Sequence, residues 1–333
     1  MANVLGESIF ATAPNGASVP DSITAADGSV WVVWGNHASA SAPPGTSGNS
    51  LIVEYNKQGG VENTYTVGGH VDGLKLDPKT GNVWVLQNED GNSTLSFIDP
   101  ATKQLSTPLK YGSGYMYGAN SPRGVDDVAF QKSTVFISQT NPANPGDPVV
   151  SELLNGNAPF GTLQTQAILR LGDTGTNLNT GATNQPLPVS DPDSLKTLPD
   201  GSLILTSEAD KAYTFIHHPG TPQQTESFFT LPSSAGTPDD AVMTRAKAGT
   251  FYISSSGSNQ VIALKVNDIN PQDLYASVGT NFDQINVKTG AITPLLTNLS
   301  GAAGILFEPS HQGGGHLLSD THGTSSHWAT GKA

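Results

Sequence analysis

An aspartate followed by a small or acidic residue and then by an apolar residue recurs five times along this chain. A sixth copy keeps the pattern but has Ala303 in place of the aspartate, and the steps between successive copies are 46 to 67 residues long. A repeat of this period is typical of propellers and solenoids, whose units bury their apolar faces against one another. The five repeated aspartates are Asp21, Asp72, Asp126, Asp193 and Asp239.

Each copy begins a hairpin pattern of two short apolar runs separated by a turn. After Asp72, the apolar run 74–76 leads through the turn 77–82 into the run 83–86. The second runs of other copies are 30–34, 203–205 and 251–253. A further hairpin follows in some repeats, and two hairpins make one propeller blade. We therefore predict an all-β fold, a six-bladed β-propeller of four-stranded antiparallel blades, as a single domain over residues 1–333 with blades starting near residues 21, 72, 126, 193, 239 and 303.

The two ends of the chain predict how the ring closes. Residues 303–333 and residues 1–20 together have the length of one blade, and the last repeat shows little strand pattern after its inner hairpin. The N-terminal run 8–12 alternates as a strand would. We expect this N-terminal strand to complete the last blade and to close the ring.

Three stretches between the predicted strands are expected to be insertions, namely residues 141–165, 172–190 and 258–278. In the first, Asp147 precedes Pro148 and Gly156 follows, a pattern that predicts a short helix. The second has few apolar residues and is predicted to be a surface loop. Insertions of this kind often border binding sites, although they can equally be surface segments with no role in binding.

The charge balance excludes some classes of partner. The chain has 28 acidic and 15 basic residues, a formal charge of −13, and no basic cluster. Nucleic-acid binding needs clustered Lys and Arg, so we expect no nucleic-acid partner. No apolar run approaches the roughly 20 residues that cross a bilayer, so we expect no membrane insertion.

The compartment is less strongly constrained. The sequence has no Cys, which excludes disulfides and thiolate chemistry. Its N-terminus has no basic segment followed by an apolar core, so we predict no signal peptide in this sequence. The abundance of Asn, Thr, Ser and Gly nevertheless favours an extracellular or periplasmic location, and we expect a monomer.

The repeated aspartates predict where a site lies. In a propeller the first strand of each blade lines the central channel, so these carboxylates should ring one mouth of it. Facing carboxylates bind a cation, share protons or remain in open water. Oxygen ligands suit Ca²⁺ or another oxygen-preferring divalent cation, and we predict Asp21, Asp72, Asp126, Asp193 and Asp239 as metal ligands. The alternative is structural, because an aspartate before a strand can accept backbone N–H bonds in an Asx-turn.

The motif is doubled at Asp126-Asp127 and at Asp239-Asp240. Successive side chains of a strand point to opposite faces, so only one carboxylate of each pair is expected to face the channel. The other is expected to stabilise a turn.

Three further residues are candidates for a substrate site. His70 precedes the second motif and could act as a general base, or it could be a polar loop residue. Arg123 could bind a substrate carboxylate or form an ordinary salt bridge. Trp34 lies on the other side of its strand from Trp31, so it could contact a substrate while Trp31 packs in the core.

The blades resemble those of the NHL proteins and of the gluconolactonase/senescence-marker-protein superfamily. Two stretches carry the resemblance, namely residues 71–85 and residues 192–203. In the gluconolactonase group, the resemblance implies a divalent metal at the channel mouth, held by Glu, Asn and Asp at this position before the first strand, and hydrolysis of a sugar lactone. Asp72, Asp126, Asp193 and Asp239 match the aspartate-type ligand position. The chain departs from the pattern, since neither Glu nor Asn stands at equivalent points.

Three hypotheses for function follow. The first is a hydrolase that uses a divalent metal to polarise the carbonyl of a lactone or ester, with Asp193, Asp239 or His70 as the catalytic acid or base. The second is a non-catalytic extracellular binding or scaffold propeller. The third is a glycosidase with a pair of carboxylates. In each binding hypothesis the ligand is a small or carbohydrate-derived molecule at the channel mouth.

Overall fold

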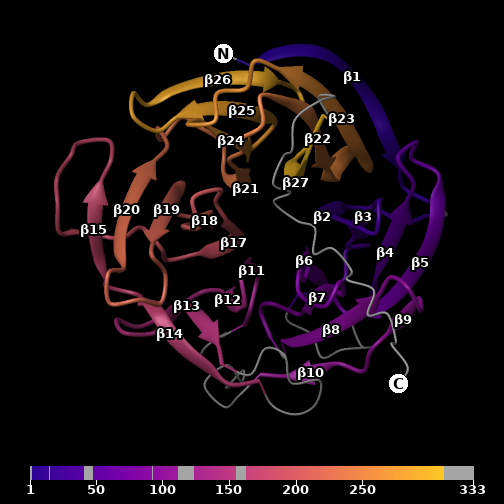
Figure 1. Cartoon of the computed structure of the whole chain (residues 1–333), viewed down its shortest axis with the longest axis horizontal. Helices are drawn as coiled ribbons and strands as arrows, with labels where there is room; N and C mark the ends of the chain where they lie inside the picture. Colours follow the sequence, from indigo (N-terminus) through magenta and orange to yellow (C-terminus); the bar gives the residue numbers. More distant parts are fainter. Residues whose placement is uncertain are drawn as a thin grey trace, which may run out of the picture.

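Six sheets, antiparallel except for one parallel pair in the fourth, are arranged around a central axis in the structure of this protein, a computed structural model that describes residues 2–14, 16–40, 48–91, 93–111, 124–154 and 163–310 (Figure 1). The described residues form strands, turns and a single 3₁₀ turn, η2 (Ser256–Ser258). The prediction of an all-β, six-bladed propeller is therefore confirmed. No helix in the described ranges has the length and apolarity that a bilayer crossing requires.

The first three blades follow chain order from the channel outward. Blade 1 contains β2 (Pro20–Ala26), β3 (Ser29–Trp34), β4 (Asn49–Tyr55) and β5 (Val61–Gly68). Blade 2 contains β6 (Val71–Leu76), β7 (Val83–Gln87), β8 (Thr94–Asp99) and the short outer strands β9 (Gln104–Leu105) and β10 (Leu109–Lys110). Blade 3 contains β11 (Val128–Gln131), β12 (Thr134–Ser138), β13 (Pro148–Leu153) and β14 (Thr165–Arg170).

The short helix predicted after Asp147 is absent, because β13 occupies this stretch. Strand β13 pairs with β12 on one side and with β14 on the other. Its Val149 and Val150 are fully buried in the core between blades 3 and 4. Burial of this β-branched pair outweighs the local helix signal, as tertiary context commonly outweighs propensity.

Blade 4 is wider than the others. It contains β17 (Pro192–Thr197), β18 (Leu203–Ser207), β19 (Ala212–His217) and β20 (Thr225–Thr230), extended by β15 (Thr174–Asn177) and β16 (Gln185–Pro186). Strand β15 lies parallel to β20, and β16 pairs with β15. The stretch predicted as a surface loop thus covers the outer edge of the blade, where an unpaired strand would invite aggregation.

Blades 5 and 6 exchange strands. Blade 5 contains β21 (Pro238–Val242), β24 (Leu274–Val278), β25 (Asn281–Asn286) and β26 (Ala291–Leu296). Blade 6 contains β27 (Ala302–Pro309), β22 (Ala248–Ser255), β23 (Gln260–Asn267) and β1 (Asn3–Thr12). The hairpin predicted directly after Asp239 is therefore wrong, since β21 pairs with β24 while β22 pairs with β27. The expected insertion at 258–278 holds β23 and β24.

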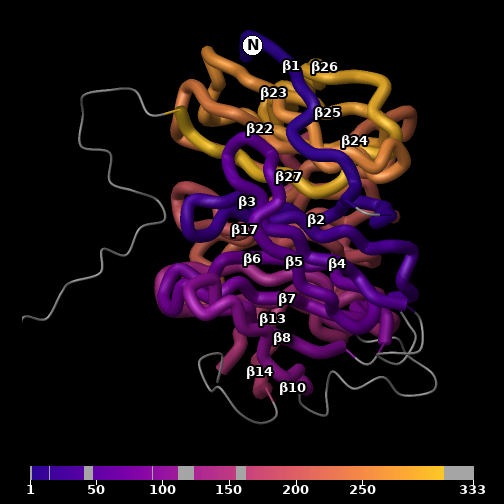
Figure 2. Tube along the Cα trace, turned by 90° about the vertical axis from the view of Figure 1, so that its right-hand side faces the viewer, coloured from indigo at the N-terminus to yellow at the C-terminus, as the bar shows by residue number. Residues whose placement is uncertain are grey.

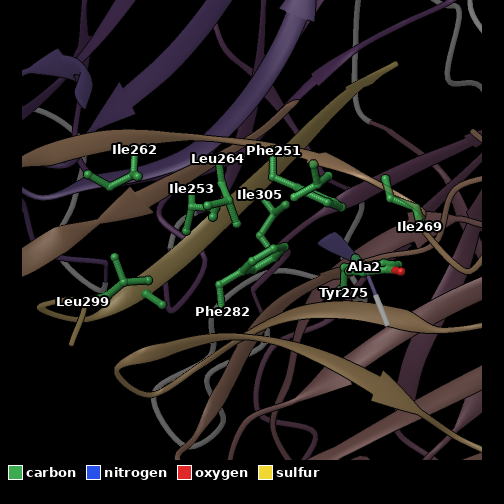
Figure 3. Packing of buried hydrophobic residues seen from close by; sticks show 12 residues of the cluster. Ala2, Phe251, Ile253, Ile262, Leu264, Ile269, Tyr275, Phe282, Leu299 and Ile305 are labelled. Atoms are coloured by element: carbon green, nitrogen blue, oxygen red, sulfur yellow. The ribbon is translucent and has the colours of Figure 1, made fainter. Parts of the chain in front are cut away.

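Packing between blades 5 and 6 explains the exchange. Phe251 of β22 is fully buried, and its ring contacts the rings of Phe282 in blade 5 and Phe307 in blade 6. Figure 3 shows this cluster, in which Ile305 of β27 and Ala2 beside β1 also take part. The cluster joins segments from both ends of the chain, so the β22–β23 hairpin links the closing blade to its neighbour.

The N-terminal strand closes the ring as predicted. Strand β1 pairs antiparallel with β23 along its whole length, from Asn3 opposite Asn267 to Thr12 opposite Gln260. Figure 2 shows β1 running along the outside of the ring beside β23. Blade 6 is therefore assembled from three separate segments of the chain.

Trp34 is fully buried, which corrects the expectation that it contacts a substrate. Along β3, Trp31 and Val33 pack into one core cluster, while Val32 and Trp34 pack into another. The second strand of a blade has a neighbouring blade on each face, so neither side of β3 is free for a ligand.

Candidate functional site

Four of the five repeated aspartates lie at β-bulges on the innermost strands, and Asp126 lies just before β11. Pairing shifts register between Pro20 and Ile23 in β2, and the same shift occurs in β6, β17 and β21. A bulge places two residues opposite one and interrupts the alternation of side chains. Asp126 and Asp127 are both buried, at 4% and 2% exposed. The two carboxylates of a doubled motif nevertheless have different partners, and the second joins neighbouring blades instead of stabilising a turn.

The second residue of the motif joins neighbouring blades. Leu74 N donates to Ser22 Oγ at 3.1 Å, and Leu195 N donates to Asp127 Oδ2 at 2.9 Å. Asp240 Oδ2 accepts the corresponding N–H of Ile305 at 2.7 Å. The second residue of the motif, rather than the first, therefore accepts backbone N–H bonds of the kind that an Asx-turn would provide.

The first residues of the motifs have no such structural role. Within the described ranges, the carboxylates of Asp21, Asp72, Asp193 and Asp239 accept no backbone N–H bond. Asp126 accepts a hydrogen bond from the side chain of Thr140. Among these atoms, Oδ2 of Asp193 is buried without a hydrogen-bond partner in the described ranges. Native proteins leave few such atoms unpaired, and one that is calls for an explanation such as an ion or catalysis.

The innermost strands of the six blades surround the centre of the ring (Figure 1). Three overlapping groups each offer ligand atoms that lie within 4.8 Å of one another. The three groups are Asp21 with His70 and Asp72, Asp72 with Asp126 and Asp193, and Asp193 with Glu208 and Asp239. All five predicted aspartates are thus brought together, and an acidic cluster that could hold a metal ion is present.

Crowding makes these carboxylates hard to ionise. Burial raises the pKa of Asp21 to about 6, with further increases from Glu89 and Asp240 that His70 partly offsets. Burial and the neighbouring carboxylates likewise raise the pKa of the other four well above the usual value: Asp72, Asp126, Asp193 and Asp239. Desolvation and like charges both penalise the anion, and a bound cation would reverse both effects.

Two acids of the mouth were missed in the sequence because they stand outside the repeat. Glu89 and Glu208 follow the second strands β7 and β18 in loops that return to the same mouth. Burial and Asp191 raise the pKa of Glu208 to about 7. The sequence signal that could have identified them is an acidic residue just after a buried second strand, although many ordinary turns also have an acidic residue at this position.

His70 lies beside the acidic ring, with its Nδ1 2.9 Å from Glu89 Oε1. Burial alone would lower the pKa of His70, but the hydrogen bond to Glu89 and the charges of Asp72 and Asp21 raise it to about 10. These neighbours favour the protonated imidazole. It can donate a proton or a hydrogen bond, rather than act as the general base expected from the sequence.

A layer of ion pairs lies next to the ring. Lys75 Nζ contacts Asp127 Oδ2 at 2.7 Å, and Lys196 Nζ contacts Asp240 and the carbonyl oxygen of Ile305. Each lysine thus pairs with the second residue of a doubled motif. The mouth keeps seven carboxylates and one imidazolium, while these two lysines are occupied by their own partners. Arg123, the remaining predicted substrate contact, lies outside the described residues.

Comparisons with known proteins agree with the fold. No family model matches the chain, and no curated protein matches it. Among solved structures, a virginiamycin B lyase from Staphylococcus aureus has a TM-score of 0.51 and 12% identity, covering 93% of this chain and 94% of that one. A candidate gluconolactonase also has a TM-score of 0.51 and 12% identity, covering 90% and 88%. The resemblance to gluconolactonase propellers is confirmed at the level of the fold.

Proposed function

We propose that this protein is a divalent-metal-dependent hydrolase, with Ca²⁺ as the cation, that opens a lactone or ester of a small or carbohydrate-derived molecule at the channel mouth. The observation that carries the proposal is the group Asp72, Asp126 and Asp193. Its three carboxylates offer oxygen atoms within 4.8 Å of one another, and Oδ2 of Asp193 is buried without a hydrogen-bond partner among the described residues. An all-oxygen donor set suits Ca²⁺.

The rest of the mouth supplies acid–base groups. When bound, Ca²⁺ would polarise the carbonyl of the substrate. Asp21, whose pKa of about 6 lies near neutral, accepts a proton from the attacking water as the C–O bond to the carbonyl carbon forms. His70, oriented by Glu89, donates its proton to the leaving alkoxide as the old C–O bond breaks. In this proposal Asp193 acts as a ligand rather than as a catalytic base, and Asp239 has no part in the proton transfers.

A binding propeller without catalysis is the second candidate. The ion pairs Lys75–Asp127 and Lys196–Asp240 come from the inner strands next to the mouth. If such side chains fill the channel, a binding or scaffold role is favoured over catalysis. The glycosidase hypothesis has less support. Ligand atoms within each acidic group lie closer than the roughly 5–9.5 Å that separates glycosidase carboxyl groups.

Chelation separates these candidates. We expect EDTA to abolish hydrolysis of a panel of aldonolactones and aryl esters, and Ca²⁺ to restore it. Asp126→Asn should lower kcat/KM at least about 100-fold, the scale of a lost electrostatic contact in an active site. The matched control is Asp27→Asn, which changes an exposed turn at the other end of β2.

Each outcome is informative. A rise in Tm with Ca²⁺ but no hydrolysis across the panel would support the binding propeller. Hydrolysis that survives EDTA and the Asp126→Asn change would contradict the metal-dependent mechanism.

A further inference from the structure

We propose that the mouth holds two cations rather than one, in adjacent sites that share Asp193. This proposal rests on the proposed metal site and adds a second site formed by Asp193, Glu208 and Asp239. The ligand atoms of these three residues lie within 4.8 Å of one another, as do those of Asp72, Asp126 and Asp193. A carboxylate has two oxygens, so Asp193 can give one to each ion.

The third acidic group does not make a third site. Its members are Asp21, His70 and Asp72, and the Nδ1 of His70 is already bound to Glu89 Oε1 at 2.9 Å. Ca²⁺ binds oxygen rather than imidazole nitrogen. This side of the mouth therefore keeps the acid–base groups, while the remaining two groups contain only carboxylates.

An unpartnered oxygen lies where the two sites meet. Oδ2 of Asp193 is buried and has no hydrogen-bond donor in the described part of the chain. Glu89 is only 8% exposed, and its Oε2 is also buried without a hydrogen-bond partner among the described residues. The charge of Glu89 raises the pKa values of Asp72 and Asp126. Buried carboxylate oxygens are normally satisfied by donors or by ions, and a cation pair that shares Asp193 would satisfy its Oδ2.

With all of its carboxylates ionised, the mouth would carry more charge than one ion can balance. Seven carboxylates face one imidazolium, which leaves an excess of about six negative charges when all are ionised. The nearest lysines are Lys75 and Lys196, and each is paired with its own aspartate. One divalent ion would leave about four of these charges, and two would leave about two.

Stoichiometry tests the proposal. Equilibrium dialysis against Ca²⁺ followed by atomic emission should find two ions per wild-type chain. Glu208→Gln should bind one, because it removes a ligand of the second site only. Asp126→Asn should also bind one, because it removes a ligand of the first. Asp27→Asn should still bind two, and circular dichroism with thermal melts would verify that each variant is folded.

The possible failures are distinguishable. One ion in the wild type, with no change on Glu208→Gln, would overturn the second site and leave the proposed function intact. No Ca²⁺ in the wild type would overturn the proposed function itself. Two ions that persist in Glu208→Gln would show that the second ion binds elsewhere, which would also overturn the proposal.

Discussion

Two adjacent residues in each motif have different tasks. The first points its carboxylate to the mouth, while the second holds the seam between blades through Ser22, Asp127 or Asp240. Where the second residue is glycine, the next blade approaches too closely for a side chain. A Cβ on Gly73 would lie 2.8 Å from Asp126 O. Packing between blades therefore limits the size of the second residue of the motif, whereas the carboxylate of the first residue remains available for function.

The Asp240–Lys196 pair gives a test at the scale of single residues. The side chain of Lys196 is 15% exposed, and desolvation lowers its pKa while Asp240 and the carbonyl oxygen of Ile305 stabilise the ammonium form. Asp240→Ala leaves this charge without its counter-ion, so we expect it to cost about 3–5 kcal/mol of unfolding free energy. Adding Lys196→Met should recover part of that loss, because no unpaired charge remains. Urea unfolding followed by tryptophan fluorescence measures both.

Equal stability of the single and double variants would contradict this role. It would mean that the lost N–H bond to Ile305, rather than the unpaired lysine, causes the destabilisation. Asp240→Asn is the matched control, since its Oδ1 can still accept that N–H.

At the scale of elements, the β22–β23 hairpin is the main departure from simple repetition. The hairpin leaves blade 5 after β21 and supplies the two middle strands of blade 6, and β24 then returns to blade 5. Both blades depend on pairings between strands that are distant in the sequence. Pairings of that kind form slowly, because loop closure precedes the contacts that stabilise them. We therefore expect blades 5 and 6 to fold last.

A disulfide can test the exchange, since the chain has no Cys of its own. Thr250 of β22 lies opposite Glu308 of β27. The double variant Thr250→Cys/Glu308→Cys should form a disulfide on mild oxidation. Closing this loop should raise stability by about 2–4 kcal/mol, with Tm falling back on reduction. Thiol titration and thermal melts with and without reductant provide the measurement.

A control pair of cysteines tests the alternative topology, in which β21 and β22 form a hairpin within one blade. In a hairpin between β21 and β22, Val242 would lie opposite Thr250, so Val242→Cys/Thr250→Cys would then cross-link instead. Efficient cross-linking of the control pair would contradict the exchange.

The sequence predicts the repeat and the closure well, because both leave a periodic pattern. It does not predict the destination of β22, since the alternation of Phe251 and Ile253 fits an inner hairpin of either blade. Likewise, Trp34 alternates as an exposed residue would, but each of its faces meets another blade. Glu89 and Glu208 come from loops outside the repeat. The ring of aspartates was thus predictable, and its non-repeating partners were not.

For the whole molecule, the acidic mouth should control stability through pH and Ca²⁺. In the folded state the pKa is raised to about 6 for Asp21 and to about 7 for Glu208. A group with a raised pKa contributes stability below its unfolded value near 4, and this contribution is lost as pH rises through the folded value. His70, with its pKa raised to about 10, changes in the same direction at higher pH. The metal-free protein should therefore lose stability from about pH 5 to pH 8.

Saturating Ca²⁺ should remove this loss, because the ions favour the ionised carboxylates. At a concentration about 100 times the dissociation constant, one site adds about 2.7 kcal/mol. Thermal melts across this pH range in EDTA and in Ca²⁺ should therefore diverge most at the alkaline end and converge near pH 5, where protons compete with the ions. Glu208→Gln should flatten the EDTA profile near pH 7, whereas Asp27→Asn should leave it unchanged. Coincident profiles in EDTA and Ca²⁺ would mean that the mouth does not bind the ion, and that its carboxylates form a neutral, proton-sharing ring instead.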